Sequence, residues 1–255
     1  MALEPPQGER VRSRLIVQTL VRPYPVSVPM VVLVSLVPVY LFIARFVAAG
    51  TVHRPALPVD DLLPLQPVWA LVYGAVYLFL ILLPVFVIQQ PEHIRRTVYA
   101  YLSVWLLAYV SFFVYPTVAP RPAVVPGDGF AVWGLKFLYA ADPPYNCFPS
   151  LHVAHAFVSA FAVYRLHRAL GGVAVFCAAL VAISTLFTKQ HYVADVLAGT
   201  LLAFAAYLVF LCRAPLEPIP EPHRQAAPLV AWVVMGIVAV AFAVYWVAYR
   251  LGFQA

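Results

Sequence analysis

Seven runs of about 20 apolar residues dominate the sequence, and no other feature limits its fold as strongly. They lie near residues 26–47, 68–89, 97–117, 148–166, 172–188, 191–212 and 227–249. About 20 residues of α-helix cross a hydrocarbon core roughly 30 Å thick. The chain is 64% hydrophobic and only 10% charged, whereas a soluble domain has roughly 25% charged residues. The sequence therefore predicts an integral membrane protein.

The runs do not alternate polar and apolar residues as the strands of a lipid-facing barrel must, so the predicted fold class is all-α. We expect a six-helix membrane domain over residues 26–212, preceded by a tail over residues 1–25. A Pro-rich linker, residues 213–226, then leads to an additional C-terminal transmembrane helix within residues 227–255. The first run is too long and too unlike a cleavage region for a signal peptide, and we expect it to remain as the first span.

Basic residues in the connections indicate the orientation, because Lys and Arg favour the cytoplasmic side of short loops. One set of connections is rich in them: Arg10, Arg12, Arg14, Arg22, Arg95, Arg96, Arg165, Arg168, Arg213 and Arg224. The opposite set has fewer: Arg54, Arg121, Lys136, Lys189 and Arg250. A cytoplasmic N-terminus in a multi-pass protein of the cell membrane is therefore predicted. The net charge of +6 is dispersed over short loops, so we expect membrane lipids and no nucleic acid as partners.

The longest connection, residues 118–147, falls on the predicted non-cytoplasmic side. Its stretch PRPAVVPGDG cannot form a regular helix, whereas FAVWGLKFLYA is rich in aromatic residues that suit the membrane interface. Connections of this length are often functional. Of the three cysteines, Cys177 and Cys212 lie inside apolar runs, so the sequence indicates no disulfide framework.

Asp195 is the one acidic residue inside a predicted span. A carboxylate there costs about 2.5–3.5 kcal/mol on insertion scales, and such residues usually have a partner and a function. His191 precedes it by four residues, which places both side chains on one helix face. The carboxylate can bond one ring nitrogen of His191, fix its tautomer and leave the other nitrogen free to attack an electrophile.

A second histidine, His152, begins another helix at the same predicted membrane face, after Pro149 and the N-cap candidate Ser150. Helix N-termini attract anions, phosphate above all. Arg121 supplies a planar fork of donors suited to phosphate, and Lys189 supplies a second positive charge. These residues predict a phosphate site with two histidines and one carboxylate.

In these residues the chain resembles the type-2 phosphatidic acid phosphatase superfamily. Arg121-Pro122 matches half of that family's first motif, Pro149-Ser150-Leu151-His152 matches the second, and His191 with Asp195 matches the third. The resemblance implies a six-helix core and double displacement without metal or cofactor. His191, oriented by Asp195, would form a phosphohistidine, and His152 would act as general acid and base. Arg121, Ser150 and Lys189 would bind the phosphate of a lipid substrate.

The sequence departs from the family pattern at two places. Val114 stands where the family has a lysine, and Ser184-Thr185 stands where it has Ser-Arg, so we expect Lys189 to replace a missing cation. The local forms YPTVAPRP, FPSLH and TKQHYVAD are closest to the inositol phosphorylceramide synthase branch. That likeness leaves two reactions open, hydrolysis of a lipid phosphate and transfer of its headgroup to an alcohol such as inositol.

Two functions from other classes of protein also remain open. A zinc enzyme could use His152, His155, His191 and Asp195, although a hydrolytic zinc site normally has a separate carboxylate base. A transporter or proton relay could use the same ionisable residues, although such pathways usually place them at several depths of the membrane.

Overall fold

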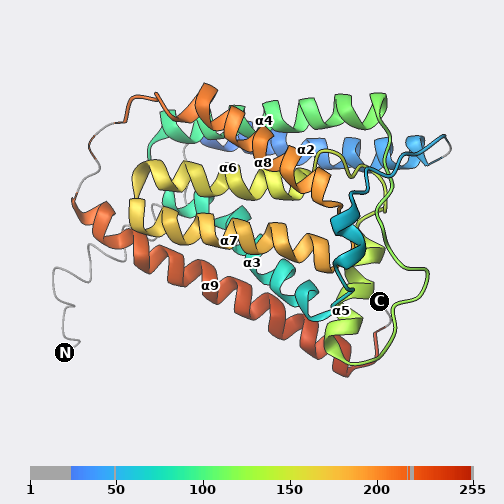
Figure 1. The fold of residues 1–255 in the computed structure, drawn as a ribbon. Helices are drawn as coiled ribbons and strands as arrows, with labels where there is room; N and C mark the ends of the chain where they lie inside the picture. The colour runs from blue at the N-terminus through green and yellow to red at the C-terminus, as the bar shows by residue number, and fades with distance from the viewer. Residues whose placement is uncertain (1–23, 49, 217, 219–220, 254–255) are drawn as a thin grey trace, which may run out of the picture.

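The computed structural model describes residues 24–48, 50–216, 218 and 221–253, and its regular structure is helical (Figure 1). The elements in chain order are α2 (Tyr24–Val47), η1 (Pro58–Leu62), α3 (Val68–Val87), α4 (Pro91–Val114), α5 (Phe130–Ala141), α6 (Leu151–Leu166), α7 (Arg168–Phe187), α8 (Val193–Ala206), η2 (Tyr207–Leu211) and α9 (Glu221–Arg250). Extended pairing within the described residues is limited to two isolated bridges. The all-α prediction is confirmed, and the predicted tail, residues 1–25, lies almost wholly outside the described residues.

Five of the described helices are long and apolar enough to cross a membrane. They are α3, α4, α7, α8 with its η2 continuation, and α9 from Ala227 to Arg250. Two further predicted spans correspond to shorter apolar helices, α6 and the Val34–Val47 part of α2. The chain is thus a membrane protein by its helices, and six spans plus a seventh remain a prediction.

Helix boundaries differ from the apolar runs where polar residues begin a helix. Helix α4 starts at Pro91, ahead of its run, because proline suits the first helical position and Glu92 pairs with Arg95 and Arg96 in the first turns. The last helix, α9, starts at Glu221, inside the stretch predicted as linker.

The central helix of the bundle is α6, which packs against α3, α4, α7 and α8 (Figure 1). Four alanines of α6 are fully buried, and small side chains let neighbouring helices approach closely: Ala154, Ala156, Ala160 and Ala162. On the outside, α2 packs on α4, and α9 lies along α3 and reaches α5. The additional C-terminal helix is therefore attached to the core by direct packing.

One end of the bundle gathers the segments that carry the predicted site. The starts of α6 and α8, the ends of α4 and α7, and the short helix α5 all lie there, at the right of Figure 1. The fold therefore brings together residues that are far apart in the sequence.

Candidate active site

The start of α6 is fixed by hydrogen bonds to two other segments. The hydroxyl of Thr117 accepts the amides of Cys147 and Phe148, both at 3.0 Å. Ser111 of α4 donates to the carbonyl oxygen of Phe148 at 2.9 Å. Ser150 then caps α6 by accepting the amide of Val153. The backbone that carries His152, in the first turn of α6, is therefore anchored.

The start of α8 lies directly against this cap. The amide of Ser150 donates to the carbonyl oxygen of Asp195 at 3.0 Å. Gly199 permits the contact, because a Cβ there would lie only 2.4 Å from the carbonyl oxygen of Ser150. The turn before α8 is closed by the amides of Gln190 and His191, which both donate to the carbonyl oxygen of Thr185.

The structure brings His152, His191 and Asp195 together in one chain of contacts. Nδ1 of His191 lies 3.3 Å from Oδ2 of Asp195, and Nε2 of His191 lies 3.3 Å from Nδ1 of His152. The same Oδ2 accepts the amide of Tyr192 at 2.9 Å, which fixes the carboxylate. Asp195 is fully buried and His191 is buried. When the Nδ1–H group of His191 donates to Asp195, the Nε2 atom of His191 carries the free lone pair and faces His152.

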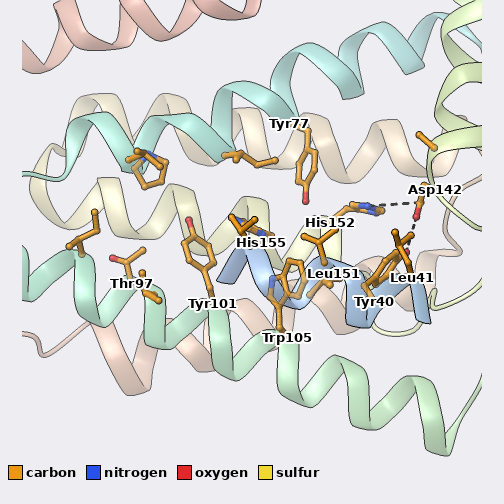
Figure 2. A pocket seen from close by; sticks show the side chains of 18 residues that line it. Tyr40, Leu41, Tyr77, Thr97, Tyr101, Trp105, Asp142, Leu151, His152 and His155 are labelled. Atoms are coloured by element: carbon orange, nitrogen blue, oxygen red, sulfur yellow. Dashed lines mark hydrogen bonds and ion pairs between the residues drawn. The ribbon is translucent and has the colours of Figure 1, made fainter. Parts of the chain in front are cut away.

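A second carboxylate, Asp142, lies on the other side of His152. Its Oδ2 is 4.0 Å from Nε2 of His152, and its Oδ1 accepts the hydroxyl of Tyr40 at 2.8 Å (Figure 2). Sequence reasoning missed both residues. Asp142 lies in the long connection, and Tyr40 is 102 positions away on α2. The one local signal was an acidic residue shortly before the FPSLH motif.

Arg121 is held next to the His152–Asp142 pair by contacts with Asp142 and Gln190. Its guanidinium donates to the carbonyl oxygen of Asp142 at 2.7 Å, pairs with that residue's carboxylate at 3.4 Å and reaches Oε1 of Gln190 at 3.2 Å. It also stacks over Tyr139, 4.5 Å from the ring centre. Nε of Arg121 and Nε2 of Gln190 are buried without a hydrogen-bond partner among the described residues. Buried unpaired donors beside two histidines suit an oxyanion.

Tyr139 holds this arrangement in place from α5. Its hydroxyl donates to the carbonyl oxygen of Thr188 at 2.6 Å. Burial raises the pKa of Tyr139 to about 12, in spite of the opposing effect of Arg121. The phenol therefore remains a donor at neutral pH.

The side chain of Lys189 contacts the short helix η1. Lys189 has a left-handed backbone (φ 55°), and its ammonium donates to the carbonyl oxygen of Asp60 in η1 at 3.2 Å. The carboxylate of Asp60 in turn accepts the amide of Val193, in the first turn of α8. Phosphate binding by Lys189 remains a prediction, and the observed contact gives it a second role in holding η1 against α8.

Replacing Lys189 with Met tests that prediction. If the ammonium binds phosphate during turnover, the rate should fall about tenfold, equivalent to about 1.4 kcal/mol, and inorganic phosphate should inhibit more weakly. The measurement is the inhibition constant of inorganic phosphate alongside the thermal midpoint in detergent. Full activity and unchanged inhibition would leave Lys189 with the structural contact alone.

Three ligand atoms lie close enough together to hold a metal ion. Cys147, His191 and Asp195 each offer one atom, and these lie within 4.8 Å of one another. This set differs from the four residues considered from the sequence, because His155 packs against Tyr101 instead. Burial is the main cause that raises the pKa of the Cys147 thiol, with the nearby carboxylates Asp195 and Asp142 adding to it. A protonated thiol is a poor ligand and a poor nucleophile.

Replacing Cys147 with Ala should therefore change turnover by less than about twofold, because neither ligation nor nucleophilic attack by sulfur is expected of a protonated thiol. The measurement is the turnover rate of wild type and variant, each with and without EDTA. A large loss in the variant, together with EDTA sensitivity of the wild type, would contradict this expectation and favour a metal site.

These observations define an all-helical membrane protein with a largely buried His-His-Asp group and an arginine at one end of its bundle. Comparison with known families agrees with this class. The chain belongs to the PAP2 superfamily, whose model matches residues 52–209. The matched range extends from before η1 into η2 and contains the site residues named above except Tyr40.

A PA-phosphatase related-family protein of Dictyostelium discoideum is 26% identical to the chain over 119 residues. The match covers 42% of this chain and 22% of the relative, so the chain spans about a fifth of that protein's length. No solved structure matches the chain.

Proposed function

We propose that this protein is a membrane lipid-phosphate phosphatase or phosphotransferase that works through a phosphohistidine intermediate. The chain of contacts from Asp195 through His191 to His152 is the observation that carries the proposal. Nε2 of His191 is the nucleophile because the carboxylate occupies Nδ1. It attacks phosphorus, the N–P bond forms, and the bond from phosphorus to the leaving oxygen breaks.

His152 serves as the general acid in the first step and the general base in the second. Its Nδ1 lies beside Nε2 of His191, so a phosphoryl group on that nitrogen would have its leaving oxygen within reach of a proton on His152. On the opposite side of the ring, Nε2 of His152 lies 4.0 Å from Oδ2 of Asp142. In the second step, His152 takes a proton from water or an alcohol, which attacks phosphorus and frees His191.

The charge of the site supports headgroup transfer as the second candidate. The hydroxyls of Ser184 and Thr185 are buried and donate to carbonyl oxygens of their own helix at 2.7 Å, so no cation replaces the missing arginine there. Lys189 is bonded to Asp60. Arg121 is thus the cation that contacts the described site residues. One cation suits the single negative charge of a phosphodiester lipid better than the two charges of a phosphomonoester.

We also propose that the site faces the non-cytoplasmic side. The distribution of basic residues supports this orientation, because His152 lies near the start of α6, whereas Arg165 and Arg168 flank its end. Labelling of single cysteines introduced after Arg168 by an impermeant reagent on intact cells would contradict this orientation.

The function is tested by incubating the purified protein in EDTA with phosphatidic acid, polyprenyl diphosphate and phosphatidylinositol, with and without inositol or ceramide. Free phosphate identifies a phosphatase, and a new phospholipid identifies a transferase. If every lipid is left intact while the protein remains folded, or turnover needs a divalent ion, the proposed function is wrong.

A further inference from the structure

A cavity of about 450 Å³ begins at the catalytic group and continues into the bundle (Figure 2). It lies between α3 on one side and the α2–α4 pair on the other, and the start of α6 contributes Leu151, His152 and His155. His152 and Asp142 line one end. Apolar side chains line the rest, among them Ile81, Val85 and Val98. The volume is within the 300–1,000 Å³ range of small-molecule sites, and the lining suits a hydrocarbon chain.

A band of polar side chains interrupts this apolar lining one helical turn beyond His152. The band consists of Tyr77, Tyr101, Trp105 and His155. Three residues of α-helix separate His155 from His152, a rise of about 4.5 Å. The band therefore lies where the part of a lipid next to its phosphate would be, ahead of the hydrocarbon tail.

Three of the four side chains in the band have a hydrogen-bonding group without a partner among the described residues. The hydroxyl of Tyr77 points into the cavity in Figure 2 and bonds to no residue in the described part of the chain. Nδ1 of His155 and Nε1 of Trp105 are also without partners there. His155 is 8% exposed. Buried polar groups without partners are costly unless a ligand or water satisfies them.

The fourth member of the band, Tyr101, and Thr97 elsewhere in the same cavity already have hydrogen-bond partners. The Tyr101 hydroxyl is bonded to Ser159 at 2.7 Å, and the Thr97 hydroxyl donates to the carbonyl oxygen of His93 at 2.8 Å. The unsatisfied groups are thus concentrated within reach of the phosphate position, and Thr97 offers a matched comparison.

We infer that the polar band binds a carbonyl oxygen placed a few bonds from the phosphate, with Tyr77 and His155 as hydrogen-bond donors. This inference rests on the proposed function and adds the substrate class. Glycerolipids and sphingolipids carry such an oxygen, as an ester or an amide. Polyprenyl phosphates have no oxygen beyond the phosphate, and they would leave the donors of the band unpaired.

The test compares diacyl and dialkyl-ether forms of phosphatidic acid and phosphatidylinositol, with ceramide 1-phosphate and a polyprenyl phosphate as further substrates. Consumption of each lipid is measured in detergent micelles. Wild type should favour the diacyl over the ether form by about tenfold, because an unpaired buried donor costs on the order of 1–3 kcal/mol. Turnover of ceramide 1-phosphate would identify the amide carbonyl as the recognised group. Turnover of the diacyl lipids would identify the ester carbonyl.

Three variants sharpen the comparison: Tyr77→Phe, His155→Leu and, as the matched control, Thr97→Val. The diacyl-to-ether ratio should fall towards one in the first two and stay at its wild-type value in the control. A ratio within each variant cancels any general loss of activity.

Equal rates on the two linkages in wild type, or a preference for polyprenyl phosphate, would overturn the inference and leave the proposed function intact. Failure of wild type to consume any of these lipids would overturn the proposed function itself.

Discussion

Replacing His152 with Ala should lower lipid-phosphate turnover by about 10²–10⁴-fold, the usual contribution of a general acid and base. The leaving alkoxide of a lipid needs the proton that His152 supplies. A p-nitrophenolate leaving group needs no such proton. On p-nitrophenyl phosphate the variant should therefore still form the phosphoenzyme, and the phosphoenzyme should accumulate because its hydrolysis lacks the base.

The measurement is a rapid-quench time course of p-nitrophenolate release, with His53→Ala as the control. His53 is an exposed histidine near the same end of the bundle and stacks on Tyr115. The control should show wild-type kinetics on both substrates. An equal loss on lipid and p-nitrophenyl phosphate in His152→Ala, without a burst, would show that His152 does not act as the acid.

Replacing Arg121 with Met should reduce both stability and turnover. Asp142 would keep a largely buried carboxylate without its cation, and breaking a buried pair in this way costs about 3–5 kcal/mol. Loss of a donor to the transferring phosphoryl group should lower turnover by about 10²–10³-fold. Thermal midpoints in detergent and steady-state kinetics measure the two effects separately.

The double variant Arg121→Met with Asp142→Asn separates the two roles of the arginine. Removing the carboxylate charge should restore much of the stability but none of the turnover attributed to phosphate binding. Recovery of turnover in the double variant would mean that Arg121 serves only to neutralise Asp142.

The helical class and the convergence of His152, His191 and Asp195 could be predicted from sequence because both depend on short-range patterns. Apolar runs mark helices, and the i,i+4 spacing of His191 and Asp195 predicts that their side chains meet. Ser150 beside Pro149 marks the helix start that aims His152. The structure agrees on the helical runs and on the cap at Ser150. His191 lies before α8, which starts at Val193, and it reaches Asp195 from the preceding turn and not from a shared helix face.

Other parts of the site depend on tertiary contacts that leave no local pattern. The pairing of Asp142 with Tyr40 joins the long connection to α2, and no spacing rule relates residues so far apart. The direction of Lys189 depends on a left-handed backbone at the end of α7, which the sequence TKQH does not reveal. The polar band depends on the packing of α3, α4 and α6 around a common cavity.

The most direct test is to identify the amino acid that carries phosphate during turnover. Wild-type protein is mixed with ³²P-labelled lipid, quenched at alkaline pH and digested, and the labelled peptide is sequenced. We predict acid-labile, alkali-stable phosphate on His191, absent from His191→Ala and retained in the His53→Ala control. Phosphate on a serine or an aspartate, or full turnover by His191→Ala, would contradict the account.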